Sequence, residues 1–252
     1  MDLKLKNKIV VVIGGSNGIG LSIVKNYLKY GAIVHCISRN SKKGLENSLH
    51  KQYGKNILFH YCDATNENDI LSCKNIITNN NKIKIDILIC NVGNGSSPNN
   101  AINNYNEWNL SWKINFESSL NSVRSFLLSI DRGSIIFIGS IAGQEFINAP
   151  TDYSVAKSAL ISFSKILSHK LAPNIRVNVV SPGNIFVKDG TWDIKSQESP
   201  DFVNDLINKK VPLKRFGETD EVANLVLFLS SEKASFITGS CYTIDGGQTT
   251  NY

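Results

Sequence analysis

Residues 9–20 read IVVVIGGSNGIG, five β-branched apolar residues followed directly by a glycine-rich loop. The apolar run predicts a buried strand, and the apolar positions of residues 19–29 recur at the spacing of an amphipathic helix. Glycines between a strand and a helix let the backbone approach a pyrophosphate, and the helix N-terminus attracts its negative charge. A simple glycine turn would have the same composition. Other parts of the sequence are therefore needed to distinguish a pyrophosphate-binding loop from a simple turn.

Beyond this unit, short apolar runs alternate with helical periods, which is typical of a parallel sheet covered by helices on both faces. We therefore expect an α/β fold with one doubly wound Rossmann domain over residues 1–252 and about seven strands. The expected strands are Ile9–Ile13, Ile33–Ser38, Ile57–Cys62, Ile85–Cys90, Ser134–Gly139, Arg176–Val180 and Tyr242–Ile244. The expected helices are Ile19–Lys29, Lys42–Tyr53, Glu67–Asn79, Tyr105–Ile130, Thr151–Leu171, Asp201–Asn208 and Asp220–Ser230.

One long break interrupts this alternation at residues 181–200, and it opens with Pro182-Gly183. A loop of that length inside a compact domain usually covers a binding site. We expect residues 181–215 to form a substrate lid.

The composition fits an ordinary globular protein, with 42% hydrophobic and 19% charged residues. It argues against a disordered, fibrous or membrane-embedded chain. The net charge of +6 comes from 27 basic and 21 acidic residues, but the lysines are scattered and no basic run is interleaved with aromatic residues. We therefore expect no nucleic-acid partner.

The five cysteines form no CxxC pair and the four histidines lack ligand spacing, so neither a disulfide framework nor a metal site is expected. No apolar signal region precedes Ile9, and no apolar stretch approaches the ~20 residues of a membrane span. These features predict a cytoplasmic protein without a membrane anchor.

The second expected strand ends at Ser38-Arg39, where a fold that prefers NAD would carry an acidic residue for the ribose hydroxyls. A hydroxyl and a guanidinium suit a 2′-phosphate instead, so NADP(H) is the preferred cofactor and NAD(H) the alternative. Alternatively, Arg39 is an exposed loop residue that contacts only solvent. Asp63, after the third strand, either accepts a hydrogen bond from the adenine amino group or caps the next helix.

Tyr153 and Lys157 lie one helical turn apart on the same face of an expected helix. A fixed positive charge near a phenol lowers its pKa from ~10 and makes it a proton donor or acceptor near neutral pH. Tyr-x-x-x-Lys alone often occurs by chance. Ser140 adds weight, because it follows an apolar strand at the sheet edge where doubly wound folds bind ligands. Its hydroxyl either holds a substrate oxygen or caps a turn.

Taken together, these motifs resemble the short-chain dehydrogenase/reductase family over residues 8–247, in the family's order. The resemblance implies that Ser140, Tyr153 and Lys157 form the catalytic set, with Asn115 relaying protons from the lysine through water. It also implies that Asp245-Gly246-Gly247 ends the last strand. The cofactor would contact residues of the glycine loop and of the loops that follow the strands, namely Gly14, Ser16, Asn17, Gly18, Ile19, Gly20, Ser38, Arg39, Asp63, Ala64, Asn91, Gly93, Tyr153, Lys157, Pro182, Gly183 and Ile185.

Four positions depart from the family pattern. Ile13 replaces a threonine before the first glycine, and Cys90 and Val92 alter the usual Asn-Asn-Ala-Gly stretch. Val187 stands where a threonine commonly contacts the nicotinamide amide, so we expect another group to fix that ring.

The resemblance implies hydride transfer between the nicotinamide and a carbonyl or secondary alcohol, with reduction as the expected direction. The expected substrate is a sugar or sugar nucleotide, or a 3-oxoacyl thioester presented by an acyl carrier protein. A non-catalytic dinucleotide-binding sensor or scaffold is the alternative function. The residues expected to contact the substrate lie in three segments: Asn94-Gly95-Ser96-Ser97, Ala142 to Phe146, and the lid residues Phe186, Lys188, Asp189 and Trp192.

Apolar residues on the two long helices exceed what one sheet face covers, which predicts a homo-oligomer, either a dimer or a tetramer. These residues are Ile114, Phe116, Leu120, Phe126, Leu160, Ile161, Phe163 and Leu167.

Overall fold

The computed structural model describes residues 2–80 and 82–250 of the chain. Seven strands form one sheet in the order β3-β2-β1-β4-β5-β6-β9, and every neighbouring pair is parallel. This confirms the expected α/β fold and the strand count. The strands are β1 (Ile9–Ile13), β2 (Ile33–Ser38), β3 (Ile57–Tyr61), β4 (Ile87–Cys90), β5 (Gly133–Ile138), β6 (Ile175–Pro182) and β9 (Cys241–Ile244).

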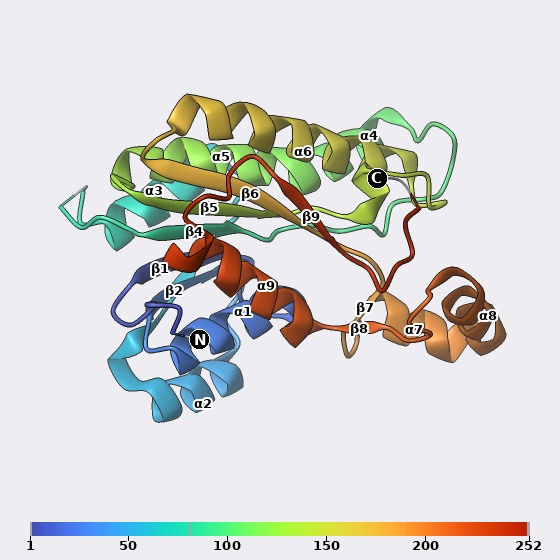
Figure 1. Ribbon diagram of the computed structural model, residues 1–252, viewed down its shortest axis with the longest axis horizontal. Coiled ribbons are helices and arrows are strands. Elements are labelled where there is room, and N and C mark those ends of the chain that lie inside the picture. The colour runs from blue at the N-terminus through green and yellow to red at the C-terminus, as the bar shows by residue number, and fades with distance from the viewer. Residues whose placement is uncertain (1, 81, 251–252) are drawn as a thin grey trace.

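Helices cover both faces of the sheet (Figure 1). One face carries α1 (Gly18–Lys29), α2 (Lys43–Tyr53) and α9 (Thr219–Ser230), and the other carries α3 (Glu67–Ile77), α4 (Tyr105–Trp112), α5 (Ser118–Phe126) and α6 (Thr151–Leu171). Along β1, Val10 and Val12 belong to one hydrophobic core, and Val11 and Ile13 to the other. A strand buried on both faces needs apolar residues at every position, which explains the uninterrupted run at residues 9–13.

The strand order reverses at β1, because β2 and β3 lie on one side of it and β4 on the other. Two chain crossovers leave in opposite directions at such a point and open a crevice beyond the carboxyl ends of the strands. The glycine loop follows β1 directly, so the sequence places it at this crevice.

The prediction of one regular helix over residues 105–130 is wrong. It consists of α4, a π-helical turn η2 (Lys113–Glu117), α5 and a 3-10 turn η3 (Leu127–Ser129). The Ser118 hydroxyl donates a hydrogen bond of 2.6 Å to the Ile114 carbonyl across the widened turn. A π-turn inserts one residue without changing the apolar pattern enough to be visible in a sequence.

The expected loop at residues 181–200 is also wrong. Strand β6 extends to Pro182, β7 (Ile185–Phe186) pairs with β8 (Gly217–Glu218), and the chain then forms α7 (Thr191–Glu198) and α8 (Pro200–Lys210). Helix α7 has no buried residue and therefore no apolar face that periodicity could detect. Together α7 and α8 project beyond the sheet (Figure 1) and pack on a small cluster of their own around Val203, Ile207 and Val211.

The apolar residues expected to remain uncovered on the long helices are mostly packed inside the molecule. Phe126 and Leu160 are fully buried, and Phe116, Ile161, Phe163 and Leu167 pack against the same core. Large apolar side chains on this side that do reach solvent include Leu110, Leu128 and Ile166. The argument for an oligomer from the first set is therefore wrong, and the oligomeric state stays a prediction.

All five cysteines are free, and Cys241 is the one that is not fully buried. In the described part of the chain, no helix has both the length and the apolar character needed to cross a bilayer.

A buried histidine pair predicts acid sensitivity. His35 on β2 and His60 on β3 stack with ring nitrogens 2.9 Å apart, and burial lowers the pKa of His35 to about 4. Protonation below the unfolded pKa of ~6.5 therefore favours the unfolded chain, and the stability this pair contributes at neutral pH is lost as the pH falls from 6.5 towards 4. We expect the free energy of unfolding to fall by about 2 kcal/mol between pH 7 and pH 5 from this residue.

Urea unfolding at both pH values checks this expectation. His35→Phe removes the titrating ring and should lose less stability over the same interval than the natural chain. Equal losses in the two proteins would show that His35 is not the sensitive group.

Candidate active site

The glycine loop after β1 forms a cradle in which Gly14, Gly18 and Gly20 have no side chain. Gly14 and Gly18 have φ angles of +79° and +49°, which favour glycine. The Asn91 amide donates a hydrogen bond of 2.9 Å to the Gly14 carbonyl and so ties the loop to the end of β4. A Cβ atom at Gly20 would overlap the Gly14 carbonyl oxygen. The loop therefore leaves the N-terminus of α1 open to a ligand, and a pyrophosphate fits it.

A cavity of about 1860 Å³ runs past this loop, along the carboxyl ends of the strands from β3 to β6. It exceeds the usual ~300–1,000 Å³ of a single small-molecule pocket, so it has room for a dinucleotide and a second ligand. Of the predicted site residues, Gly20 and Asn115 do not line it and act through their neighbours. The cavity is lined by the predicted residues Gly14, Ser16, Asn17, Gly18, Ile19, Ser38, Arg39, Asp63, Ala64, Asn91, Gly93, Ser140, Tyr153, Lys157, Pro182, Gly183 and Ile185.

At the β2 end of the cavity, Arg39 is exposed and Ser38 is buried, with its hydroxyl donating to the Asn40 carbonyl. Asp63 Oδ1 accepts hydrogen bonds from the backbone N–H and the hydroxyl of Thr65. The alternative role of Asp63 as a helix cap is wrong, because Asn66 caps α3 through its own side chain. Arg39 thus places an exposed guanidinium at this end of the cavity.

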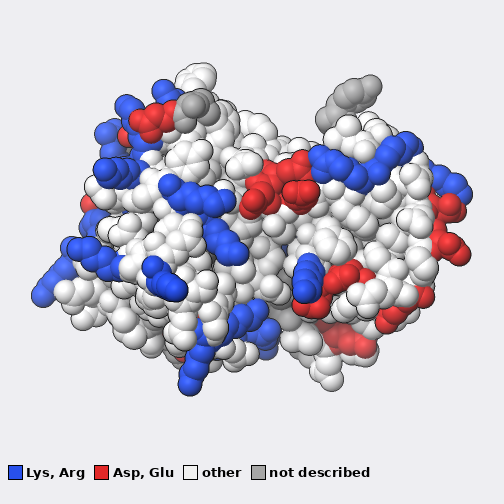
Figure 2. Space-filling model, turned by 90° about the horizontal axis from the view of Figure 1, so that it is seen from below, with Lys and Arg blue, Asp and Glu red and all other residues white. Residues whose placement is uncertain are grey.

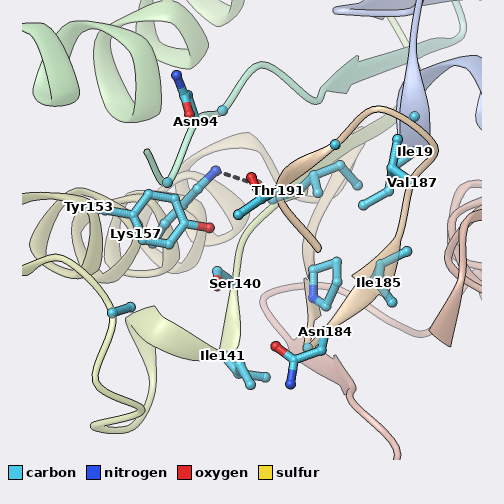
Figure 3. Close-up of a pocket in the computed structure, with 18 of the residues that line it drawn as sticks. Ile19, Asn94, Ser140, Ile141, Tyr153, Lys157, Asn184, Ile185, Val187 and Thr191 are labelled. Carbon is cyan, nitrogen blue, oxygen red and sulfur yellow. Dashed lines mark hydrogen bonds between the residues drawn. The ribbon is translucent and has the colours of Figure 1, made fainter. Parts of the chain in front are cut away.

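Tyr153 and Ser140 meet inside the cavity. Tyr153 lies in the first turn of α6, and Ser140 follows β5. The Ser140 hydroxyl lies close enough to the phenol to act on its pKa, and Ser140 Oγ accepts a hydrogen bond of 3.1 Å from the Ala142 N–H. Both interpretations of Ser140 therefore describe real contacts, since it caps the turn Ile141–Gly143 (η4) and faces the phenol. Figure 3 shows the Tyr153 hydroxyl pointing into the space that Ser140, Ile185 and Val187 surround.

Lys157 points into the same space from the next turn of α6. Its side chain is buried, and its Nζ donates a hydrogen bond of 2.9 Å to the Ile138 carbonyl. The Nζ atom lies 5.9 Å from the centre of the Tyr153 ring. A Cβ atom at Gly93 would lie 2.9 Å from this Nζ, so the glycine makes room for the ammonium group.

The pKa of Tyr153 differs from the expectation. Burial raises the pKa of the phenol above 10, and the nearby Ser140 hydroxyl only partly opposes that rise. Burial also lowers the pKa of Lys157 to about 8. Desolvation is the larger of these two influences on the phenol, so Tyr153 keeps its proton at neutral pH.

Asn115 lies in the π-turn, fully buried beside the cavity. Its Oδ1 accepts a bond of 2.8 Å from the Asn94 N–H, and its Nδ2 donates to the carbonyls of Asn94 and Ser111. A Cβ at Gly93 would lie 3.3 Å from Asn115 Oδ1. Asn115 therefore fixes the loop after β4 that passes over Lys157.

A buried carboxylate that we did not predict holds the start of α6. Asp152 is 1% exposed and accepts hydrogen bonds from Ser97, from Asn103 and from the backbone N–H of Tyr153. An acidic residue in the first turn of a helix was the one signal available, and it is common on helices without any site.

Several expected substrate contacts are wrong. Ala142, Gly143, Gln144, Phe186, Lys188 and Asp189 do not line the cavity. The Gln144 amide instead bonds Cys241 and Thr243 on β9, and Phe186 packs on Phe216 with ring centres 5.9 Å apart. Residues that we did not predict line the cavity instead, including four from α8. Asn184 also lines it, and its amide donates a hydrogen bond to Gln248.

The described residues contain no group of three histidine, cysteine, aspartate or glutamate side chains that could hold a metal ion. The donor set of the cavity is instead an open helix N-terminus, a guanidinium, a phenol and an ammonium group, and this set fits a nicotinamide dinucleotide.

A family model described as enoyl-(acyl carrier protein) reductase matches residues 14–249. The chain is 34% identical over 251 residues to the 3-oxoacyl-[acyl-carrier-protein] reductase FabG of Chlamydia trachomatis, covering 96% of this chain and 98% of that protein. It is also 34% identical over 253 residues to a tropinone reductase homolog of Arabidopsis thaliana, covering 98% and 93%.

Among solved structures, the L-sorbose reductase of Gluconobacter frateurii in complex with NADPH and L-sorbose superposes with a TM-score of 0.90 at 28% identity. That alignment covers 100% of both chains. The likeness extends over the whole fold, including the segment with α7 and α8.

Proposed function

The chain belongs to the short-chain dehydrogenase/reductase family, and from this premise we propose that it is an NADP(H)-dependent ketoreductase that converts a carbonyl into a secondary alcohol. As a member of the family it is an NAD(P)-dependent oxidoreductase. One observation carries the finer proposal: Tyr153, Ser140 and Lys157 share one cavity with the glycine loop and Arg39. A proton donor and a dinucleotide cradle in one cavity are what carbonyl reduction requires.

Two ends of the cavity would hold the cofactor. The glycine loop would take the pyrophosphate on the N-terminus of α1, and Arg39 with Ser38 would take the 2′-phosphate of NADP(H). Asp63 would bind at the adenine, and Lys157 at the nicotinamide ribose. When bound, the nicotinamide supplies the hydride for the carbonyl carbon.

The proton for the carbonyl oxygen would come from Tyr153. Because burial raises the pKa of this phenol, it is protonated at neutral pH and suited to donate rather than accept a proton. Ser140 would hold the substrate oxygen beside the phenol, and Lys157, with its pKa lowered to about 8, is still mainly charged at pH 7 and would stabilise the phenolate that forms. Asn115 would act as a positioning residue for the Lys157 pocket.

Two classes of substrate suit this cavity: a sugar or sugar nucleotide, and a 3-oxoacyl thioester. Polar side chains such as Asn94, Ser97 and Asn184 line the cavity and suit hydroxyl groups. Trp192 and Phe202 line it as well and suit an apolar chain. The relatives named above act on both classes, and an acyl carrier protein is a possible partner for the second.

Oxidation of NADPH, followed at 340 nm with a panel of keto-sugars and a panel of acetoacetyl thioesters, tests this proposal. We expect turnover with members of one panel and a lower KM for NADPH than for NADH. Binding of NADPH without oxidation by any carbonyl would overturn the reductase and support a dinucleotide-binding sensor.

Arg39 supplies a sharper test of cofactor choice. We expect Arg39→Ala to raise the KM for NADPH by about 10-fold or more, since a lost charge-assisted pair with a phosphate is worth ~1.5–3 kcal/mol. The KM for NADH should stay within about two-fold, because NADH lacks that phosphate. Equal changes for both cofactors would contradict a 2′-phosphate site.

Three further features stay proposals. Residues 181–215, with α7 and α8, would form the substrate lid of a single domain spanning residues 1–252. The protein would assemble as a dimer or tetramer. It would reside in the cytoplasm.

A further inference from the structure

The inner face of α8 is partly cationic. Phe202, Leu206, Lys209 and Lys210 line the cavity, while Val203 and Ile207 face the separate apolar cluster that α7 and α8 share. This second face fixes the rotation of the helix, so the cavity face is set by packing and not by chance exposure. Residues 202, 206, 209 and 210 recur at helical spacing, with aromatic and aliphatic side chains first and lysines at the C-terminal end.

Helix α7 and the chain after α8 add two more lysines. Lys195 lines the cavity, with its Nζ 5.2 Å from the centre of the Trp192 ring, and Lys214 lines it beyond α8. Figure 2 shows the molecule hollowed between the body and the half that carries α7 and α8, with basic side chains on both sides of the hollow. The α7–α8 side of the cavity therefore presents lysines from three successive segments.

Little negative charge opposes these lysines. Among the described residues, Asp63 and Glu145 are the carboxylates that line the cavity. Asp63 lies at the β3 end, and the Glu145 carboxylate accepts hydrogen bonds from the N–H and hydroxyl of Thr250. Lys209 is paired with Asp205 at 2.6 Å, whereas no ion pair forms at Lys195 or Lys210 in the described chain.

Lys195 and Lys210 lie on other elements than Arg39, although the segment that carries them begins close to the glycine loop, where a Cβ at Gly18 would lie 3.3 Å from Val187. The segment leaves the sheet after β6, and Arg39 follows β2, so β1, β4 and β5 lie between the two. At ~4.8 Å per strand, four spacings put the two strand ends about 19 Å apart. The pyrophosphate has its own site on the glycine loop. Lys195 and Lys210 are thus a second group of cations in the cavity, on elements other than those proposed to hold the cofactor phosphates.

We propose that Lys195 and Lys210 form a phosphate subsite, and that the substrate carries a phosphate ester remote from its reacting carbonyl. The inference rests on the proposed reductase function for its choice of substrate. Trp192, Phe202 and Leu206 line the same side of the cavity and would contact the part of the substrate between its phosphate and its carbonyl. A phosphopantetheine arm and a sugar phosphate share this chemistry.

Calorimetric titration of the full-length protein saturated with NADP⁺ tests the subsite without turnover. The probes are two matched pairs, 4′-phosphopantetheine against pantetheine and fructose 6-phosphate against fructose. We expect the phosphorylated member of one pair to bind at least about 10-fold more tightly than its neutral partner. The pair that shows the difference identifies the source of the phosphate.

The variant Lys195→Gln/Lys210→Gln should abolish this difference. Lys188→Gln is the matched control, because Lys188 is an exposed lysine of the same segment that does not line the cavity, and it should preserve the difference. Equal or absent binding of both members in both pairs overturns the subsite, as does a preference that survives the double substitution. A phosphate preference in a protein that oxidises NADPH with no carbonyl supports the subsite and counts against the reductase alone.

Discussion

Replacing the Tyr153 phenol with a phenyl ring should lower kcat for carbonyl reduction by about 10³-fold, within the range of a lost general acid. Tyr153→Phe keeps the ring but removes the hydroxyl that points into the cavity near Ser140. The phenol points into the cavity and keeps its proton at neutral pH, because burial raises its pKa. Single-turnover oxidation of saturating NADPH measures the effect on the chemical step.

The matched control is the affinity for NADPH, followed by the fluorescence of the bound cofactor. It should change by less than about three-fold, since the pyrophosphate and 2′-phosphate sites lie on other elements of the cavity. In the natural protein, the rate of reduction should also fall at high pH, as the phenol loses its proton. Turnover that persists in Tyr153→Phe with cofactor binding unchanged would eliminate Tyr153 as the acid.

The inner strands of the sheet were accessible to sequence analysis because they are buried on both faces. Residues 9–13 and 33–38 are apolar nearly throughout, and both strands begin and end at the predicted residues. Helix α6 also spans the predicted residues 151–171. Its packing against the sheet imposes a periodic apolar face, which is the strongest signal that a single sequence carries.

The helices between β6 and β8 could not all be predicted from the sequence, because part of this segment is not buried against the sheet. Helix α7 buries no residue, so nothing selects an apolar stripe along it. The π-turn around Asn115 was hidden as well, because one inserted residue leaves the flanking helices amphipathic. Elements held by local hydrogen bonds, rather than by packing on the sheet, leave little trace in hydrophobic periodicity.

The sequence motifs identified the candidate residues, but they could not predict how burial changes the pKa of those residues. The spacing of Tyr153 and Lys157 predicts that they share a helix face, and it says nothing of how deeply that face is buried. Burial reverses the expected change in the pKa of the phenol. The cationic face of α8 could not be predicted from the sequence at all. Lys209 and Lys210 look like an ordinary basic pair, and only the packing of Val203 and Ile207 shows which way the helix is turned.

The largest effect on the cofactor cradle is expected from a single methyl group at Gly20. Its Cβ would overlap the Gly14 carbonyl oxygen and lie 2.5 Å from Asn91 Nδ2. Those two atoms form the hydrogen bond that ties the loop to β4, so relieving the overlap must move the loop and weaken the bond. We expect Gly20→Ala to lower the free energy of unfolding by about 1–3 kcal/mol, as overpacking does.

Binding of NADPH to Gly20→Ala should weaken by at least about 10-fold, because the displaced loop no longer presents its backbone N–H groups to the pyrophosphate. Gly44→Ala is the matched control, since a Cβ at this position of α2 has no neighbouring atom within 4 Å. It should leave NADPH binding unchanged and raise the free energy of unfolding by up to about 1 kcal/mol, as alanine does in place of glycine in a helix. Urea unfolding and fluorescence titration of both variants measure the two quantities. Natural affinity for NADPH in Gly20→Ala would show that the pyrophosphate does not depend on this loop, and the cofactor would then have to bind elsewhere in the cavity.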